Sequence, residues 1–341
     1  MVDPRQDLYG EQQFDYDPVG SRLLSTSEKQ ILLDPAGNIL QESNDTQREY
    51  RYNAQNRISE YHENGQLKAR YHYNSLGQRI HKAVIQADGT EAHTLFHHGQ
   101  QGELLGESRL NNNDTSKTSH TQNIVWLQMR PVVALDSSAD DQHSPRIAWL
   151  HSDHLLTARA ATDKSQNLIW RWHSDAFGVG EAESLVRAGQ PELTLNLRFP
   201  GQYHDAESGL YYNYFRSYDP SMGRYTQSDP IGLLGGVNTF GYVAGNPLAR
   251  LDPYGLLIVY PEDDPDFMRD VELARQYLPL LDQYFRELDV LDAELHLIRI
   301  GRGDKPRFQE ELIDLEPCGT PSPFSEPSSI FWNSKRREQD S

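Results

Sequence analysis

The chain has 341 residues, enough for one large or two ordinary domains, and 37% of them are hydrophobic. Its formal net charge of -18 argues against a surface that coats nucleic acid, although it leaves room for a small nuclease tip with a local basic site. The single cysteine, Cys318, excludes an internal disulfide framework and a thiolate zinc site.

Export and membrane signals are missing from this sequence. It has no apolar run of about eighteen residues, so we expect no membrane-spanning helix. The first residues, MVDPRQDLYGEQQFDYD, are polar and acidic and include no apolar core of a Sec-type signal peptide. We therefore expect a cytoplasmic protein until a dedicated secretion machine exports it.

A short pattern recurs in the N-terminal part. Residues 14–23, FDYDPVGSRL, return as YHYNSLGQRI at residues 71–80, with a shortened copy at 50–58 and a degenerate one at 33–40. Unrelated hairpins would explain one copy but not the repetition. Each copy predicts a strand, a tight turn and a second strand, in which Asp or Asn opens the turn and Gly or Asn56 takes the left-handed position.

This pattern resembles the YD repeat. The resemblance implies a curved, mainly antiparallel sheet, and we expect Tyr16, Tyr52 and Tyr73 on its inner face. Two polar stretches, residues 108–123 and 137–144, are low in complexity and predict exposed loops between strand pairs.

The sequence WLHSDHL at residues 149–155 holds three potential metal ligands, His151, Asp153 and His154. Alternate residues of a strand point to opposite faces, so His151 and Asp153 share a side that His154 does not. A structural role is favoured over a metal site. No metal and no cofactor is predicted anywhere in the chain.

Residues 197–256 alternate Tyr- and Phe-rich runs with turn residues such as Asp219-Pro220, Gly235-Gly236 and Asn246-Pro247. Proline fixes its φ near the value that a turn requires, and glycine adopts positive φ without steric cost. Aromatic residues between turns fit a pleated, half-buried surface. We predict a meander of short antiparallel strands without a helix.

This segment resembles the Rhs-repeat-associated core of Rhs polymorphic toxins and of the toxin-complex C subunit. The similarity rests on SGLYY at 208–212, RSYDP at 216–220, GRY at 223–225, SDPIGL at 228–233 and DPYGL at 252–256. The resemblance implies a β-shell, to which residues 149–155 also belong. It implies a variable toxin tip after Leu256, a cognate immunity protein for that tip, and a secretion-machine spike or adaptor as partner; nucleic acid is not expected as a partner of the shell.

Asp229 and Asp252 are the candidate catalytic residues. Two adjacent carboxylates cannot both ionise easily, so one keeps a proton and polarises a carbonyl while the other activates water. The resemblance implies cleavage of the chain's own Leu256–Leu257 bond by this pair, with Arg224 as a supporting cation. The alternative is that both residues, each followed by proline, only form turns, as Asp219 does.

The character of the sequence changes after Leu256. Asp264-Pro265 predicts a helix start, the apolar spacing from Phe267 to Leu288 predicts a helix interrupted at Pro279, and residues 294–300 predict a buried strand. The densest polar set there favours a solvated strand end over a nuclease or transferase site, and Cys318 is treated as incidental; that set comprises His296, Arg299, Arg302, Asp304, Arg307 and Glu310.

We therefore predict a mainly β fold of antiparallel YD-repeat hairpins, followed by a small α+β or mostly helical tip. The expected domains are a repeat sheet at 1–196, the core at 197–256 and the tip at 257–341. The favoured function is a toxin carrier that presents, and releases by self-cleavage, an effector tip used in interbacterial competition. The alternative is a non-enzymatic structural or adhesive repeat protein, or a truncated remnant with an inactive tip.

Overall fold

The structure is a computed structural model that describes residues 13–256, except 19, 101, 113, 139–144 and 188–189, together with the backbone of residues 260–261 and 299–300. The chain divides into two compact units, Met1–Leu257 and Ile258–Ser341. In the second unit, the described backbone forms two short parallel strands, β21 (Tyr260–Pro261) and β22 (Arg299–Ile300). The predicted helix and the polar set of the tip lie outside the described residues, apart from the backbone of Arg299.

The first unit contains a sheet of 16 strands in which every strand pairs with its neighbours in the sequence. The strands β1 to β8 are Phe14–Tyr16, Leu23–Thr26, Gln30–Leu33, Ile39–Ser43, Gln47–Tyr52, Ile58–Glu63, Gln66–Tyr73 and Arg79–Ile85. The strands β9 to β16 are Glu91–His98, Leu104–Asn111, Asp114–Leu127, Arg130–Ser138, Arg146–Ser152, Ala158–Thr162, Leu168–Trp172 and Ala182–Ser184. All of these pairings are antiparallel, which confirms the predicted fold class for this unit.

The turns of the repeats are built as the sequence predicts. Asn53 and Asn74 each accept hydrogen bonds at Oδ1 from backbone N–H groups two and four residues later. The left-handed position is taken by Asn56 in one copy and by Gly77 in the other. In the turn that Asp153 opens, Leu156 adopts φ 65°, a conformation in which a side chain is disfavoured.

The tyrosines of the repeats behave in two ways. Tyr52 and Tyr73 pack against the buried cluster and donate their hydroxyl groups to the carbonyl oxygens of Ile39 and Ile58, both at 2.7 Å. Tyr16 differs from the prediction because its side chain remains 42% exposed. It lies in β1, at the edge of the sheet, where one face of its ring meets the Arg224 guanidinium.

The prediction of an exposed loop at residues 108–123 is wrong. Most of these residues belong to β10 and to the 14-residue strand β11, which pair from Gly106 with Asn123 to Asn111 with Asp114, with register shifts on both sides of Leu110. Ser and Thr side chains on the exposed positions of β11 need no apolar partner, so this strand has no hydrophobic alternation to reveal it. Of the second predicted loop, residues 137–138 end β12, and 139–144 lie outside the described residues.

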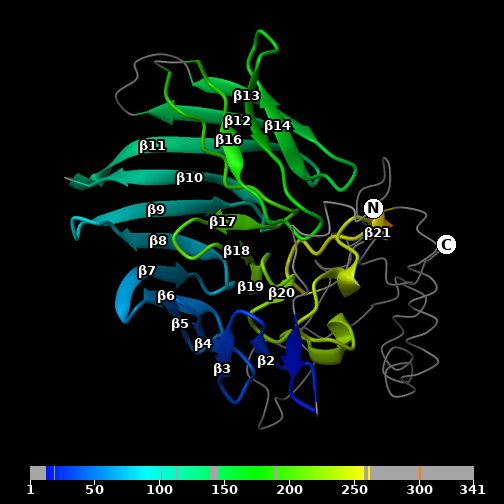
Figure 1. Cartoon of the computed structure of the whole chain (residues 1–341). Helices are drawn as coiled ribbons and strands as arrows, with labels where there is room; N and C mark the ends of the chain where they lie inside the picture. The colour runs from blue at the N-terminus through cyan, green and yellow to red at the C-terminus, as the bar shows by residue number, and fades with distance from the viewer. Residues whose placement is uncertain are drawn as a thin grey trace, which may run out of the picture. The chain divides into compact units, whose positions relative to one another are not determined.

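The core meander forms a second sheet of four antiparallel strands, β17 (Tyr203–Asp205), β18 (Leu210–Asn213), β19 (Arg216–Asp219) and β20 (Arg224–Tyr225). Two short 3-10 turns follow, η2 (Gly232–Gly235) and η3 (Val243–Gly245). Figure 1 shows the large sheet curling around these strands. Residues of the meander belong to three buried clusters of the described sheet: Leu210 shares one with Tyr50 and Tyr61, Tyr212 shares one with Phe96, and Tyr218 shares one with Trp172.

No helix in the described part of the chain is long and apolar enough to cross a membrane. The predicted domain boundaries at 196 and 256 stay predictions.

Candidate functional site

The two candidate carboxylates lie together in the core meander. Asp229 follows β20 and Asp252 precedes the end of the described segment, and their residues are 6% and 2% exposed. Both contact one nitrogen of Arg216: Nη2 lies 2.9 Å from Asp229 Oδ2 and 3.2 Å from Asp252 Oδ2. Residues that are far apart in the sequence therefore form one buried cluster, in which a guanidinium group bridges the two carboxylates.

Arg216 is held in place from several sides. It lies on β19, it is 3% exposed, and its guanidinium carbon is 3.7 Å from the centre of the Tyr225 ring. Its Nε donates to the carbonyl oxygen of Gly255, and its Nη1 donates to that of Thr239 at 3.1 Å. Because planar guanidinium donors are directional, these bonds fix the nitrogen that contacts the carboxylates.

The carboxylate of Asp252 accepts more hydrogen bonds than that of Asp229. Its Oδ2 accepts a hydrogen bond from the Tyr225 hydroxyl at 2.8 Å, and its Oδ1 accepts one from the backbone N–H of Leu256 at 2.9 Å. Asn213 donates to both the Tyr225 hydroxyl and the Asp252 carbonyl, at 2.7 and 2.9 Å. The bond to Leu256 is a turn contact, so the turn-forming and the functional interpretations of Asp252 apply to the same side chain.

Gly235, at the end of η2, lies beside both Asp229 and the predicted cleavage point. A Cβ atom on Gly235 would lie 2.2 Å from Asp229 Oδ2 and 2.7 Å from the carbonyl oxygen of Leu256. The carboxyl group of Asp229 and the carbonyl of the predicted scissile bond thus face the same small space. Only glycine leaves that space open, because any side chain would collide with backbone and carboxylate.

Burial raises the pKa of Asp229 to about 7, with Arg216 and the Ile231 N–H opposing the shift and Asp252 adding to it. Burial also raises the pKa of Asp252, against Arg216, the Leu256 N–H and the Tyr225 hydroxyl. Asp229 accepts fewer hydrogen bonds than Asp252, because its partners are the Ile231 N–H at 3.0 Å and Arg216. The geometry therefore favours a protonated Asp229 beside an ionised Asp252.

Arg224 does not occupy the position that the sequence suggested for it. Its Nη2 donates to the carbonyl oxygen of Ser21 at 2.7 Å, and its guanidinium lies over Tyr16 and Phe240. Arg224 therefore connects the core meander to the first hairpin. The cation between the two carboxylates is Arg216. Leu257 lies outside the described residues.

Three residues of the site, Arg216, Tyr225 and Gly235, are not among the candidates that the sequence predicts. Arg216 and Tyr225 stand in the motifs RSYDP and GRY, but only the structure shows that every residue of their strands is buried. Gly235 appeared as half of a turn, and its closeness to Leu256 depends on the fold.

The three residues of the 149–155 stretch each have a separate partner. Asp153 caps a turn through Leu155 N–H and Thr157 N–H and binds Arg159 Nε at 2.8 Å. His151 contacts the Thr162 hydroxyl, and His154 donates to the Leu248 carbonyl oxygen. They do not converge.

Comparisons with known proteins define the family. No family model matches the chain. It is 32% identical over 263 residues to double-stranded DNA deaminase toxin A of Burkholderia cenocepacia, covering 70% of this chain and 17% of that protein. It is 34% identical over 220 residues to the toxin protein Tse5 of Pseudomonas aeruginosa, covering 58% of this chain and 16% of that protein. A probable deoxyribonuclease RhsA of Dickeya dadantii is 55% identical over 86 residues, 25% of this chain and 6% of that protein.

The chain belongs to the Rhs family of polymorphic toxins. The crystal structure of TcdB2-TccC3-TEV resembles this Rhs chain with a TM-score of 0.54 at 20% identity, over 72% of this chain and 13% of that one, which shows a shared fold. The Rhs chain spans about a sixth of the length of the first two relatives.

Proposed function

We propose that this Rhs chain is the closing part of a toxin carrier, which hydrolyses its own Leu256–Leu257 bond and so separates an effector tip used in interbacterial competition. One observation carries the proposal: two buried carboxylates share Arg216, and one of them faces the Leu256 carbonyl oxygen across Gly235. Tethering replaces a substrate-binding site, because the reacting bond belongs to the same folded unit as its catalytic groups.

The proposed reaction gives each carboxyl group a separate role. Asp229 in its acid form donates a hydrogen bond to the Leu256 carbonyl oxygen, while the Asp252 carboxylate removes a proton from a water molecule that attacks the carbonyl carbon. The C–N bond breaks, the Leu256 carboxyl group forms, and the Leu257 nitrogen leaves as an amine with the transferred proton. Arg216 is a positioning residue: it holds the Gly255 carbonyl and both carboxylates.

The rate of self-cleavage is expected to fall as the pH rises above neutrality. Since the pKa of Asp229 is raised to about 7 and its acid form is required, the rate falls about tenfold per pH unit above about pH 7. Timed intact-mass measurements from about pH 5 to about pH 9 provide the rates, with circular dichroism to confirm that the fold persists. A rate that increases with pH across this window would contradict the acid role of Asp229.

The effector role is tested by the tip itself. Induction of residues 257–341 in a bacterial cytoplasm is expected to stop growth, and co-expression of a neighbouring gene for an immunity protein is expected to restore it. Residues 1–256 induced from the same promoter are the control and leave growth unchanged. Normal growth with a soluble, folded tip would favour the alternative, a structural or adhesive repeat protein.

A further inference from the structure

Tyr225, on β20, contacts two different groups of the carboxylate cluster. Its ring faces the Arg216 guanidinium, with 3.7 Å between the guanidinium carbon and the ring centre. Its hydroxyl donates to Asp252 Oδ2 at 2.8 Å. In the described part of the chain, the Asp229 carboxyl group contacts Arg216 and the Ile231 N–H but no hydroxyl. The two carboxyl groups therefore share one cation and differ in this one hydroxyl donor.

Asn213, on β18, fixes the direction of the Tyr225 hydroxyl proton. The Asn213 atom that lies 2.9 Å from the Asp252 carbonyl oxygen must be the amide nitrogen Nδ2, because a carbonyl oxygen can only accept. The second hydrogen of Nδ2 is donated to the Tyr225 hydroxyl oxygen at 2.7 Å. Tyr225 is fully buried, so bulk water offers its proton no other acceptor. A hydroxyl that accepts from Asn213 is therefore left to donate its single proton to Asp252.

The charged and titratable groups around Asp252 come from the elements packed against it. Arg216 on β19 and Asp229 after β20 face it, and the ring of Tyr242, before η3, lies 5.8 Å from that of Tyr225. Burial raises the pKa of both tyrosines, and the Asp252 carboxylate adds to the shift, so both stay neutral. The neutral Tyr225 hydroxyl favours the ionised form of Asp252 and so opposes the effect of burial on the pKa of that carboxyl group.

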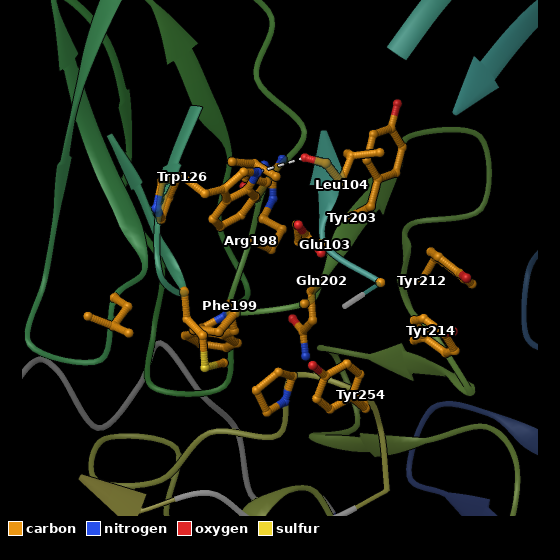
Figure 2. A pocket seen from close by; sticks show the side chains of 18 of the residues that line it. Glu103, Leu104, Trp126, Arg198, Phe199, Gln202, Tyr203, Tyr212, Tyr214 and Tyr254 are labelled. Carbon is orange, nitrogen blue, oxygen red and sulfur yellow. Dashed lines mark hydrogen bonds between the residues drawn. The ribbon is translucent and has the colours of Figure 1, made fainter. Parts of the chain in front are cut away.

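A cavity of about 100 Å³ borders the segment that follows Asp252 (Figure 2). Pro253 and Tyr254 line this cavity, whereas Asp229, Asp252 and Tyr225 do not. The cavity therefore offers the two carboxyl groups no polar partner, and their charges depend on the protein donors that contact them.

We propose that Tyr225 assigns the roles of the two carboxyl groups: its hydroxyl proton, directed by Asn213, keeps Asp252 as the base and leaves the acid proton on Asp229. This inference rests on the proposed self-cleavage and adds a residue to it. Tyr225 is a positioning residue, because it acts through Asp252 and neither gains nor loses a proton in the reaction.

Tyr225→Phe removes the hydroxyl and keeps the ring that faces Arg216. Without this donor the pKa of Asp252 rises further, so the acid side of the pH–rate profile is expected to move up by about one to two pH units. At a fixed pH on that side, self-cleavage slows about 10- to 100-fold. The alkaline side, which follows Asp229, stays in place. Timed intact-mass measurements on the full-length chain from about pH 3 to about pH 9 give both sides of the profile.

Tyr218→Phe is the matched control. Tyr218 is fully buried and is the cross-strand partner of Tyr225, but its hydroxyl donates to the Phe177 carbonyl oxygen at 2.7 Å. Its acid side should coincide with that of the parent. Asn213→Leu is the second variant if Tyr225→Phe does not fold. Without the amide, the Tyr225 proton is no longer directed to Asp252, so the acid side moves in the same direction by a smaller amount.

Carboxyl-carbon NMR titration of the full-length chain measures the protonation of Asp252 directly, whether or not the chain is cut. The Asp252 signal is assigned by its loss in Asp252→Asn. A parent that does not cleave would refute the proposed function, and the titration would still decide the role of Tyr225. Equal titration midpoints of Asp252 in the parent, Tyr225→Phe and Asn213→Leu, or an equally large shift in Tyr218→Phe, would overturn the inference.

Discussion

Asp229→Asn and Asp252→Asn are each expected to slow self-cleavage by about 10²- to 10⁴-fold, the usual contribution of a positioned acid or base. Asparagine keeps the shape of the carboxyl group but can neither donate an acidic proton to the Leu256 oxygen nor accept one from water. Where the parent yields two fragments, each variant should remain a chain of 39.1 kDa by intact-mass analysis.

The two residues act as one unit, so the double variant should be no slower than the slower single variant. Asp219→Asn is the matched control: Asp219 also precedes a proline and is 4% exposed, but it caps the turn to Ser221 instead of facing Leu256. This control should still cut itself. Continued cleavage at Leu256 in either of the other two variants would show that the pair is not catalytic.

Asp205→Ala is expected to lower the free energy of unfolding by about 3–5 kcal/mol, because it removes the carboxylate partner of the buried Arg79 and leaves the buried Lys82 with Glu207 alone. Asp205, on β17, contacts Arg79 Nη1 at 2.5 Å and Lys82 Nζ at 3.0 Å. Both cations come from β8, so this pair of contacts fastens the core meander to the inner face of the sheet. Arg79 also lies 4.3 Å from the centre of the Tyr212 ring.

The measurement is urea-induced unfolding of the variant and the parent, followed by tryptophan fluorescence. The matched control is Glu183→Ala, which removes an exposed ion pair. In this pair Arg171 Nη2 lies 2.8 Å from Glu183 Oε2, and the side chains of Arg171 and Glu183 are 41% and 48% exposed. Its effect should stay within about 0–1 kcal/mol. An Asp205 variant no less stable than this control would show that the buried contacts do not hold the core.

The sequence was sufficient for features that depend on neighbours along the chain. The turns opened by Asn53 and Asn74 follow from residues within five positions, and so do the short strands of the meander. The pairing of Asp229 with Asp252 came from a motif resemblance and not from spacing, because no local rule places residues 23 positions apart side by side.

Other features depended on distant contacts or on the absence of a local signal. Arg216 reaches the carboxylates only because β19 lies beside both turns, and Gly235 matters only because Leu256 returns to it. Arg224 was assigned to the wrong contact for the same reason, since its partner Ser21 lies 203 positions earlier. The polar strand β11 was missed because its exposed Ser and Thr residues carry no hydrophobic pattern.

The strictly sequential order of β1 to β16 has a consequence for the making of the protein. Each new strand finds its partner in the strand synthesised just before it, so the sheet can assemble hairpin by hairpin during translation, with little loop-closure cost. The core contacts are different, because Asp205 must find Arg79 and Arg224 must find Ser21 across the completed sheet. Asp252 is synthesised after all of these residues, so the carboxylate pair becomes complete only on a chain whose sheet is already available to receive it.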